Sequence, residues 1–444
     1  MTVIEGRRRS GRQARQVAPR ADLGQWSARQ RQQPALAVIA AQSRSRLPEL
    51  APIRHARMAS SPWHFYRGAA AVMAADLATA PHSGLMVQLC GDAHVLNFGL
   101  WATPERNLAF DLRDFDETLP GPFEWDVKRL VTSLQVAAGT DTSPRRSAAA
   151  VASCLRSYRQ HMASFATAPE LDIWYDATHV DRMLAVFTEP GARERLSRHI
   201  TNKARRRTSR GAHDKLTALI DGRQRITEDP PFRVHLDGAE HAQAAQALHT
   251  YRQSLSQDHQ HLLDRFELVD VVRQVVGVGS VGMRVYLALL QGRGGDDPLF
   301  LQVKEATTSV YEPHLEPSTY ASHGERVVVG KRLIQSATDI FVGWAAVGQQ
   351  HYYVRQFRDM KVIPDSQRLT PYLVDFATAC GAVLARAHAR TGDAVAIHAY
   401  IGRGSAFDKA MASYALAYAR QNHRDHADLV EAISRRQLAA GRAW

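Results

Sequence analysis

The sequence has few cysteines and no long apolar run, and each shortage excludes a class of protein. Its three cysteines, Cys90, Cys154 and Cys380, are far apart and never form a C-x-x-C pair, so neither a disulfide framework nor a zinc knuckle is expected. Apolar stretches end well before the roughly 18 residues that a membrane-spanning helix requires. The opening, MTVIEGRRRSGRQ, lacks the apolar segment of a secretory signal. We therefore expect a cytoplasmic protein with reduced thiols and no membrane partner.

Lysine is also scarce, although positive charge is abundant. Lysine and arginine together number 56 against 44 acidic residues, which gives a formal charge of +12, and only seven of the basic residues are lysines. Such an excess speeds the capture of anionic ligands such as phosphates without specifying which one. The length of 444 residues and the 45% of hydrophobic residues indicate a globular chain of two or three domains, or one two-lobed enzyme.

The hydrophobic patterns divide the chain into four parts. Residues 1–50 predict a basic, partly disordered arm, and residues 51–264 are mainly helical with short strands at GLMVQLC and NLAFDL. Near residue 265 the period changes, and RQVVGVGSVGMRVYLALLQG with LFLQVKEA predicts a β-hairpin inside a small β lobe over 265–362. Helices within 363–444 are expected to complete a large helical lobe. The predicted fold class is therefore α+β and bilobal.

Individual elements within these parts have local signals. Ser60-Ser61-Pro62 is a cap followed by proline in the first turn, which predicts the start of a helix over 62–80. Periodicity further predicts helices over 323–336 and 371–390 and strands over 339–344 and 352–357.

A first group of residues has the spacing that phosphoryl transfer requires. In GDAHVLN, Asp92 and Asn97 stand in a loop after a strand, and Asp114 ends the next strand. Transfer from a nucleotide uses one carboxylate to orient and deprotonate the acceptor hydroxyl, and an amide oxygen with a second carboxylate to hold magnesium. We predict Asp92 as the base and Asn97, Asp114 and Asp116 as the magnesium ligands. The alternative is a polar turn whose carboxylates face water.

A second group combines a glycine run with a lysine. A G-x-G-x-x-G run that opens a helix is typical of a dinucleotide fold, but here a strand follows. A glycine loop between two strands, with Lys304 on the next strand, instead matches the lid over ATP phosphates in protein kinases. The alternative for Lys304 is a solvated residue at a sheet edge. The predicted nucleotide-binding residues are Gly277, Gly279, Ser280, Gly282, Lys304 and its acidic partner on the following helix, Glu325.

Longer motifs carry two resemblances. RMASSPWHFYRGAA, LCGDAHVLNFG, DFDETLPGPFEWDVKRL and LQVKEA resemble the bacterial domain-of-unknown-function 2252 family from about Arg44 to the end of the chain, which implies no activity. LARAHA at 384–389, GDAHVLN at 91–97 and RDFD at 113–116 are similar, more distantly, to motifs of aminoglycoside and choline kinase-like enzymes. The second resemblance implies a bilobal protein-kinase-like fold that binds ATP and Mg²⁺.

The kinase-like motifs occur in an altered order. The glycine loop, the lysine and the LARAHA helix come last, so the resemblance implies a circularly permuted kinase-like fold. Lys304 should then face Asp114, and the end of the LARAHA helix should approach Cys90. Cys90 replaces the usual histidine, and the metal motif reads DFD rather than DFG. These departures leave open a pseudokinase that binds nucleotide without turnover.

The expected function is ATP- and Mg²⁺-dependent transfer of the γ-phosphoryl group to a hydroxyl of a small molecule or, with less support, of a protein. Nucleotidyl transfer is an alternative that the sequence does not distinguish. A basic segment over 201–216 also allows a nucleic-acid-binding protein, although it lacks the aromatic residues that stack on bases. His94 in GDAH resembles one motif of binuclear phosphoesterases, but their GNH motif is absent. His388 is expected to be a packed helix residue.

Overall fold

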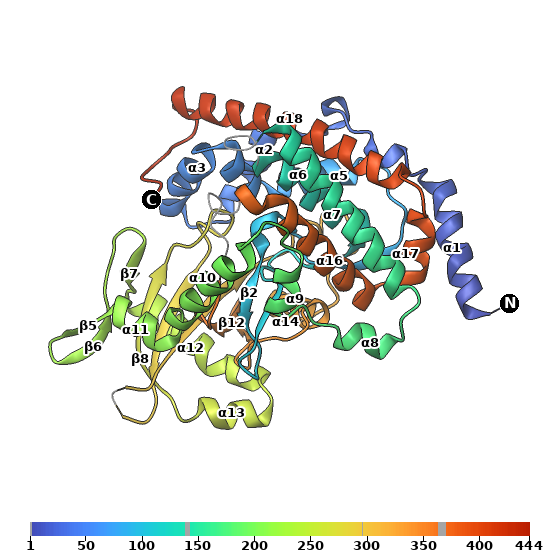
Figure 1. The fold of residues 1–444 in the computed structure, drawn as a ribbon. Coiled ribbons are helices and arrows are strands. Elements are labelled where there is room, and N and C mark those ends of the chain that lie inside the picture. Colours follow the sequence, from blue (N-terminus) through green and yellow to red (C-terminus); the bar gives the residue numbers. More distant parts are fainter. Residues whose placement is uncertain (1, 138–142, 295, 363–369) are drawn as a thin grey trace.

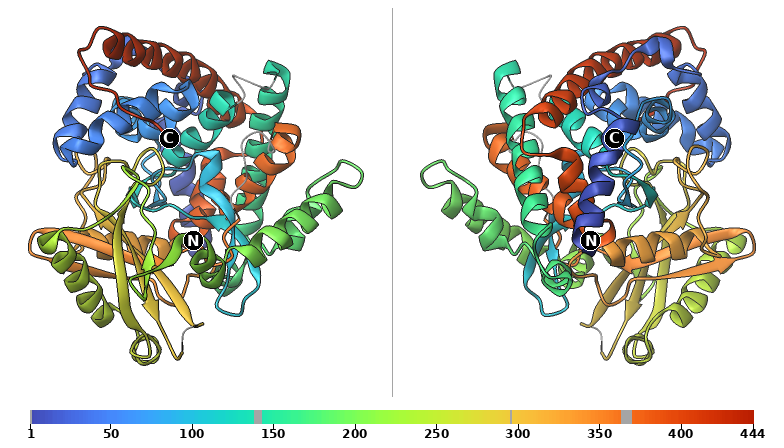
Figure 2. Two further views of the ribbon diagram at one scale, coloured as in Figure 1. Left: turned by 90° about the vertical axis from the view of Figure 1, so that its left-hand side faces the viewer. Right: turned by 90° about the vertical axis from the view of Figure 1, so that its right-hand side faces the viewer.

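The computed structural model describes residues 2–137, 143–294, 296–362 and 370–444. A predominantly helical part lies beside a part built on one large sheet (Figures 1 and 2). Every strand pair among the described residues is antiparallel. The predicted α+β class with a small antiparallel sheet is therefore confirmed. Within the described ranges, every helix is too short or too polar to cross a lipid bilayer.

The helical part surrounds a core formed by α6, α7, α16 and α18, which pack on one another. Its helices are α1 (Val3–Val17), α2 (Ala35–Arg44), α3 (Ala51–Ala59), α4 (Pro62–Gly68), α5 (Ala70–Ala78), α6 (Phe123–Ala137), α7 (Pro144–Phe165), α8 (Glu170–Tyr175), α9 (Val180–Ala185), α10 (Ala192–Arg206), α16 (Leu373–Thr391), α17 (Ala394–Ile401) and α18 (Ala406–Ser434). Two small sheets pair β1 (Met86–Leu89) with β4 (Leu119–Pro122) and β2 (Phe98–Ala102) with β3 (Leu108–Leu112). Nearly every residue of α6 is buried, as expected for a helix at the centre of a core.

The helix predicted over 62–80 is divided into α4 and α5. Its start is as predicted, because the Ser61 hydroxyl accepts a hydrogen bond from the backbone NH of His64 and Pro62 follows. The division falls at Ala69, whose backbone leaves the helical region (φ −107°, ψ 33°). Gly68, directly before it, lies so close to Met58 of α3 that a Cβ atom there would meet the methionine side chain at 2.6 Å.

The first 50 residues, expected to be a basic arm, fold onto the helical part. Thr2 and Glu5 form a capping box at the start of α1, which packs against α17. Arg15 and Arg20 donate hydrogen bonds to carbonyl groups at the end of α17, Tyr400 and Ile401. Cations favour this position because the last carbonyls of a helix lack partners and carry partial negative charge. Two of the arginines that suggested a solvated arm therefore hold it to the fold.

The large sheet has the strand order β11-β12-β10-β9-β8-β7. Its strands and the elements near it are β5 (Thr217–Ile220), β6 (Arg223–Ile226), β7 (Arg233–His235), β8 (Glu267–Gln274), β9 (Val285–Gln291), β10 (Pro298–Ala306), β11 (Gly343–Val347), β12 (Gln350–Gln356), α11 (Ser209–Leu216), α12 (Gly238–Tyr251), α13 (Gln257–Leu263) and α14 (His323–Ile334). The hairpin expected from the alternating pattern is β9 with β10, in which Lys304 is paired with Val285. Strand β7 is part of this sheet and helix α12 packs against it, although both precede residue 265. The predicted boundary at 362/363 lies at the edge of residues 363–369, which are outside the described part of the chain.

Candidate functional site

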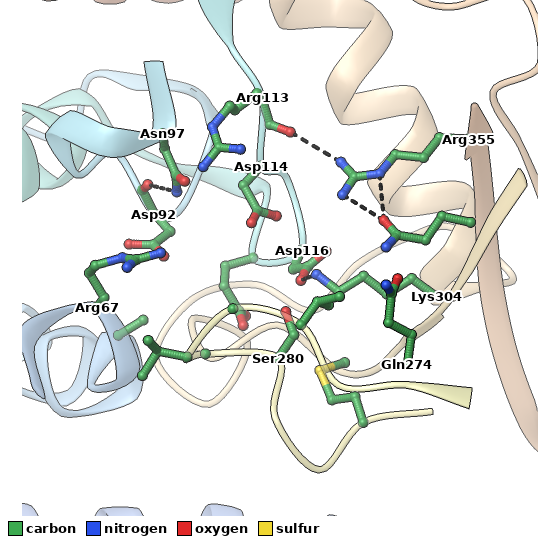
Figure 3. A pocket seen from close by; sticks show the side chains of 18 of the residues that line it. Arg67, Asp92, Asn97, Arg113, Asp114, Asp116, Gln274, Ser280, Lys304 and Arg355 are labelled. Atoms are coloured by element: carbon green, nitrogen blue, oxygen red, sulfur yellow. Dashed lines mark hydrogen bonds and ion pairs between the residues drawn. The ribbon is translucent and has the colours of Figure 1, made fainter. Parts of the chain in front are cut away.

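A cavity of about 460 Å³ lies where the sheet meets the helical part. Segments from 42 to 361 contribute to its lining, so it assembles residues that are far apart in the sequence. Figure 3 shows Asp92 and Asn97 on one side, Asp114 near the middle and Lys304 on the other side. The predicted residues that line the cavity are Asp92, Asn97, Asp114, Asp116, Gly277, Gly279, Ser280 and Lys304.

The loop that carries Asp92 is held by hydrogen bonds to helix α6. The carboxylate of Asp126 accepts hydrogen bonds from the backbone NH groups of Cys90 (2.8 Å) and Gly91 (3.2 Å). Gly91 has φ +86°, and a Cβ atom there would meet the Glu117 carbonyl oxygen at 2.3 Å, so glycine is required at this turn. These contacts fix the backbone directly before Asp92.

Arg129, one turn after Asp126 on α6, orients the Asp92 side chain. Its Nε lies 2.9 Å and its Nη2 2.8 Å from Asp92 Oδ1. Oδ2 of Asp92 is 3.7 Å from Nε2 of His94 and accepts no hydrogen bond within the described part of the chain. Burial raises the pKa of Asp92, and so does the charge of Asp114, against the lowering effect of Arg129. A carboxylate that is positioned, with a raised pKa and one available oxygen, has the properties of a general base.

Asp114 lies at the centre of the lining with one carboxylate oxygen unpaired. Its buried Oδ1 has no hydrogen-bond partner. Burial would raise its pKa, but the charges of Lys304, Arg355 and Arg113 together hold the pKa well below the ordinary value for aspartate. Asp114 is therefore ionised and faces the cavity, with cations around it rather than bonded to it.

Lys304 faces Asp114, as the sequence predicts, but its carboxylate partner is Asp116. The Lys304 ammonium donates a hydrogen bond to Asp116 Oδ2, and the Tyr353 hydroxyl donates one of 2.7 Å to Oδ1. Burial would lower the pKa of Lys304, yet the charges of Asp116 and Asp114 raise it above the ordinary value, so the amine stays protonated. Only 2% of the lysine side chain is exposed. A solvated position at a sheet edge is thus excluded.

Glu325 is not brought to Lys304. No ion pair joins the two in the part of the chain that the structure describes, and Glu325 does not line the cavity. The next residue of α14, Arg326, contacts the segment that carries Asp116 from outside the cavity lining, and its guanidinium donates to the carbonyl groups of Thr118 (2.6 Å) and Asp116 (2.9 Å). The prediction failed because a helix face cannot be oriented from sequence alone to within one residue, which is a rotation of about 100°.

The glycine loop, residues 275–284, is held by arginines of the helical part. Arg46 Nη1 and Arg57 Nη1 each donate a hydrogen bond of 2.6 Å, to the carbonyl oxygens of Gly279 and Gly277 respectively. Gly282 lies just outside the lining and has φ +91°, and a Cβ atom there would meet Cβ of Arg46 at 2.8 Å. The loop is therefore a fixed wall of the cavity whose shape depends on glycine at 282.

The lining carries a large excess of positive charge. Eight of its side chains are cationic and four are carboxylates, Asp92, Asp114, Asp116 and Glu117. The cations are Arg46, Arg67, Arg113, Arg207, Lys304, Arg355, Arg358 and Lys361. All but Lys304 lack any spacing signal, because one arginine in an arginine-rich sequence has no local signature of a binding role. An enclosed surface of this charge suits a polyanion.

Two of these residues have side chains that form no hydrogen bond or ion pair with the described residues. Arg67 and Lys361 both line the cavity, and the Nε atom of Arg67 is buried without a partner. Burial lowers the pKa of Lys361 well below the ordinary value for lysine, and the neighbouring charges of Arg355 and Arg113 lower it further. Each side chain pays a desolvation cost that an anion in the cavity would offset.

Magnesium was predicted at Asn97, Asp114 and Asp116, and the residues partly fit it. Asp114 offers an unpaired buried oxygen, whereas Asp116 is occupied by Lys304 and Tyr353, and Asn97 donates its amide to the carbonyl of Asp92. Among the described residues no group of three or more His, Cys, Asp or Glu side chains is arranged to hold a metal by itself. Magnesium in nucleotide sites is commonly held by one or two carboxylates together with phosphate oxygens and water. Asp114 and the Asn97 carbonyl meet that lesser requirement.

The end of α16 approaches the loop that carries Asp92. The Thr391 hydroxyl accepts a hydrogen bond of 3.1 Å from the backbone NH of Gln88, in the strand that leads to Cys90. His388 is fully buried, with Nδ1 2.8 Å from the Tyr158 hydroxyl and Nε2 3.5 Å from Asp126. It is a packed helix residue, as predicted, and it stands behind the carboxylate that holds Cys90.

Comparison with known proteins yields one finding. The model of a family described as "Uncharacterized protein conserved in bacteria (DUF2252)" matches residues 46–432, which include every residue that lines the cavity except Gln42. No curated protein and no solved structure matches the chain. The family resemblance of the motifs is confirmed, and the more distant resemblance to kinases stays a prediction.

Proposed function

Because the chain belongs to the DUF2252 family of bacterial proteins, for which no activity is described, we propose its function from the site alone. The proposed activity is transfer of the γ-phosphoryl group of ATP to a hydroxyl of a small-molecule acceptor, with Mg²⁺. The observation that carries the proposal is the meeting of Lys304 and Asp114 in one cavity with Asp92 and the glycine loop. These two parts are more than 150 residues apart, and phosphoryl transfer requires both.

Each residue has a role that follows from its surroundings. The glycine loop and Lys304 would hold the triphosphate, and the unpaired cations Arg67 and Lys361 would bind its remaining charge. Bound Mg²⁺, on Asp114 and Asn97, would neutralise charge on the β- and γ-phosphates. Asp92 Oδ2 would accept the proton of the acceptor hydroxyl. The hydroxyl oxygen would then bond to the γ-phosphorus as the bond between that phosphorus and ADP breaks. Arg129 would hold the Asp92 carboxylate in the orientation that this proton transfer requires.

The kinase-like fold in circularly permuted order is part of the same proposal. Support comes from the order of the elements. Strand β8, the glycine loop and strand β9 are followed by β10 with Lys304, then by helix α14 and by strands β11 and β12. Further support comes from the end of α16 lying beside the Asp92 loop. Residues 265–362 would then be the small lobe and the flanking parts the large lobe.

The test combines nucleotide binding with a transfer screen. We expect ATP with Mg²⁺ to raise the melting temperature of the wild-type protein, and mass spectrometry to detect a gain of one phosphoryl group in a member of a metabolite library. Asp92→Asn should keep ATP binding and lower transfer by about 10²- to 10⁴-fold, the usual effect of removing a general base. Asp408→Asn, which alters an ion pair with Arg159 outside the cavity, is the matched control.

The two rival outcomes are distinct. ATP binding without product from any acceptor, and unaffected by Asp92→Asn, would indicate a pseudokinase. A product that carries a nucleotidyl group, with release of pyrophosphate, would indicate nucleotidyl transfer. Absence of any ATP-dependent stabilisation would contradict the proposal as a whole.

A further inference from the structure

A second concave site adjoins the cavity at α10 and α11. Its volume is about 320 Å³, and five of its seven lining residues are cationic. No lining residue among those described is a carboxylate. The lining consists of His199, Asn202, Lys203, Arg206, Arg207, Lys215 and Arg358, which we call the basic annex. It contains much of the basic segment that the sequence left without a function.

The basic annex and the main cavity share a wall. Arg207 and Arg358 line both. The backbone NH of Met360 donates a hydrogen bond of 2.6 Å to the Arg207 carbonyl, and Arg358 Nη1 donates one of 3.3 Å to Gly211. A molecule in the annex would therefore border the space that holds Lys361 and Asp114.

The shared wall includes a strained turn. Arg358 and Met360 have φ values of +68° and +50°, which place two non-glycine residues in the left-handed region within three positions. Such backbone is costly and persists where surrounding contacts impose it, often at functional sites. Here the turn places Arg358 against both cavities and Lys361 in the main one.

A structural role alone explains only part of the annex. Lys203 and Arg206 lie in the last turn of α10, where cations favour the negative end of the helix dipole. That effect requires neither a cavity nor Lys215, which comes from the next helix. It also leaves the strained turn and the shared arginines unexplained.

We propose that the basic annex binds a phosphate group of the acceptor, so that the substrate is a small phosphorylated molecule whose hydroxyl reaches Asp92. This inference rests on the proposed function for the hydroxyl, while the anion site stands on its own geometry. Five cations are more than a ligand carboxylate with a single negative charge would need for pairing. They suit a ligand group with a charge near −2, such as a phosphate. Among the described residues that line the annex there is no Phe, Tyr or Trp on which a base could stack, so a phosphate monoester suits the annex better than a nucleic acid.

The first test measures binding of inorganic phosphate to the full chain by calorimetry, without ATP. The variant Arg206→Ala/Lys215→Ala removes two exposed cations that line only the annex, so the fold should be retained. Its dissociation constant for phosphate should rise about tenfold or more, since charge-assisted hydrogen bonds are lost. Arg205→Ala/Lys409→Ala removes the same charge from exposed positions outside both cavities and should change the constant less than twofold. Lys304→Ala should also retain this phosphate site.

Equal phosphate affinity for the wild type and Arg206→Ala/Lys215→Ala would overturn the anion site. A single-stranded RNA oligonucleotide that binds far more tightly than phosphate, and loses that affinity in the same variant, would overturn the small-molecule assignment in favour of a nucleic-acid surface.

The second test uses turnover. Once a transfer product is found, the variant should raise the KM for a phosphorylated acceptor about tenfold while leaving the KM for ATP unchanged. If the wild type and the variant both used an unphosphorylated acceptor in preference to a phosphorylated one, the inference would be contradicted and the proposed function would stand. Phosphate binding that behaves as expected in a protein that never uses ATP would contradict the proposed function and leave the anion site standing.

Discussion

The two walls of the main cavity are stabilised in different ways. The acidic wall, Asp92 with Asp114, is supported by Asp126 and Arg129, which follow Asp92 within 40 residues of sequence. The glycine loop is supported by Arg46 and Arg57, which precede it by more than 200 residues. One wall is therefore supported by its own neighbourhood and the other by a remote segment. Variants should separate chemistry, which depends on the first, from nucleotide affinity, which depends on the second.

The largest effect is expected at Lys304, which bonds from strand β10 to Asp116, two residues after Asp114 of the acidic wall. Lys304→Ala should lower kcat/KM for ATP by about 10²- to 10³-fold, as for other groups that stabilise developing charge. It should also lower the free energy of unfolding by about 3 to 5 kcal/mol, because Asp116 loses its buried partner. Transfer assays and urea denaturation measure the two effects. Lys409→Ala on the exposed face of α18 is the control, and an equal loss of activity there would contradict the assignment.

A smaller effect, confined to chemistry, is expected from the support of the acidic wall. Asp126→Asn keeps the size of the side chain but removes the charge that accepts from the amides of Cys90 and Gly91. Misplacement of Asp92 should lower kcat about 10- to 100-fold with little change in ATP affinity. Steady-state kinetics beside ATP titration measures this split. A rise in the dissociation constant for ATP that matches the fall in kcat would show that the two walls are not independent.

The support of the glycine loop should act in the opposite sense. Arg46→Ala removes the hydrogen bonds to Gly279 and Val281 and should raise the KM for ATP about five- to tenfold with kcat nearly unchanged. Arg44→Ala, an exposed arginine two residues earlier, should have no effect. A fall in kcat without a change in KM would indicate that the loop takes part in chemistry rather than in holding nucleotide.

The smallest effect on activity is expected at Lys128, which lies on α6 between the two residues that hold Asp92. Burial lowers the pKa of Lys128 to about 8, although the charge of Glu124 opposes the shift. The fold thus favours the neutral amine, so stability should rise as the pH increases from about 8 to the ordinary lysine value near 10.5. Lys128→Met should remove that rise and stabilise the protein at pH 7, with kcat unchanged. Thermal denaturation against pH measures it, and an identical pH profile in the variant would contradict the buried-amine interpretation.

Some features of the site were accessible from sequence because they depend on local spacing. Asp92, Asn97 and Asp114 lie close together in the sequence, in a loop and at the end of the next strand, and the alternating pattern around Lys304 correctly predicted a hairpin. Glu325 was predicted as the partner of Lys304, whereas the structure has Asp116, since the choice depends on how α14 is rotated against the sheet. The unpaired cations Arg67 and Lys361 and the basic annex had no local pattern to reveal them.

The amino-acid sequence alone determined the family, the α+β class and the residue types that chemistry requires, because periodicity, caps and glycine turns act over a few neighbouring positions. Only the tertiary structure decided which of those residues share a cavity, which carboxylate pairs with Lys304 and which arginines hold the glycine loop. Those choices depend on contacts between segments hundreds of residues apart, such as Arg46 with Gly279. The energy of such a contact resides in burial and in the relative placement of the two segments, and neither is encoded at one position of the chain.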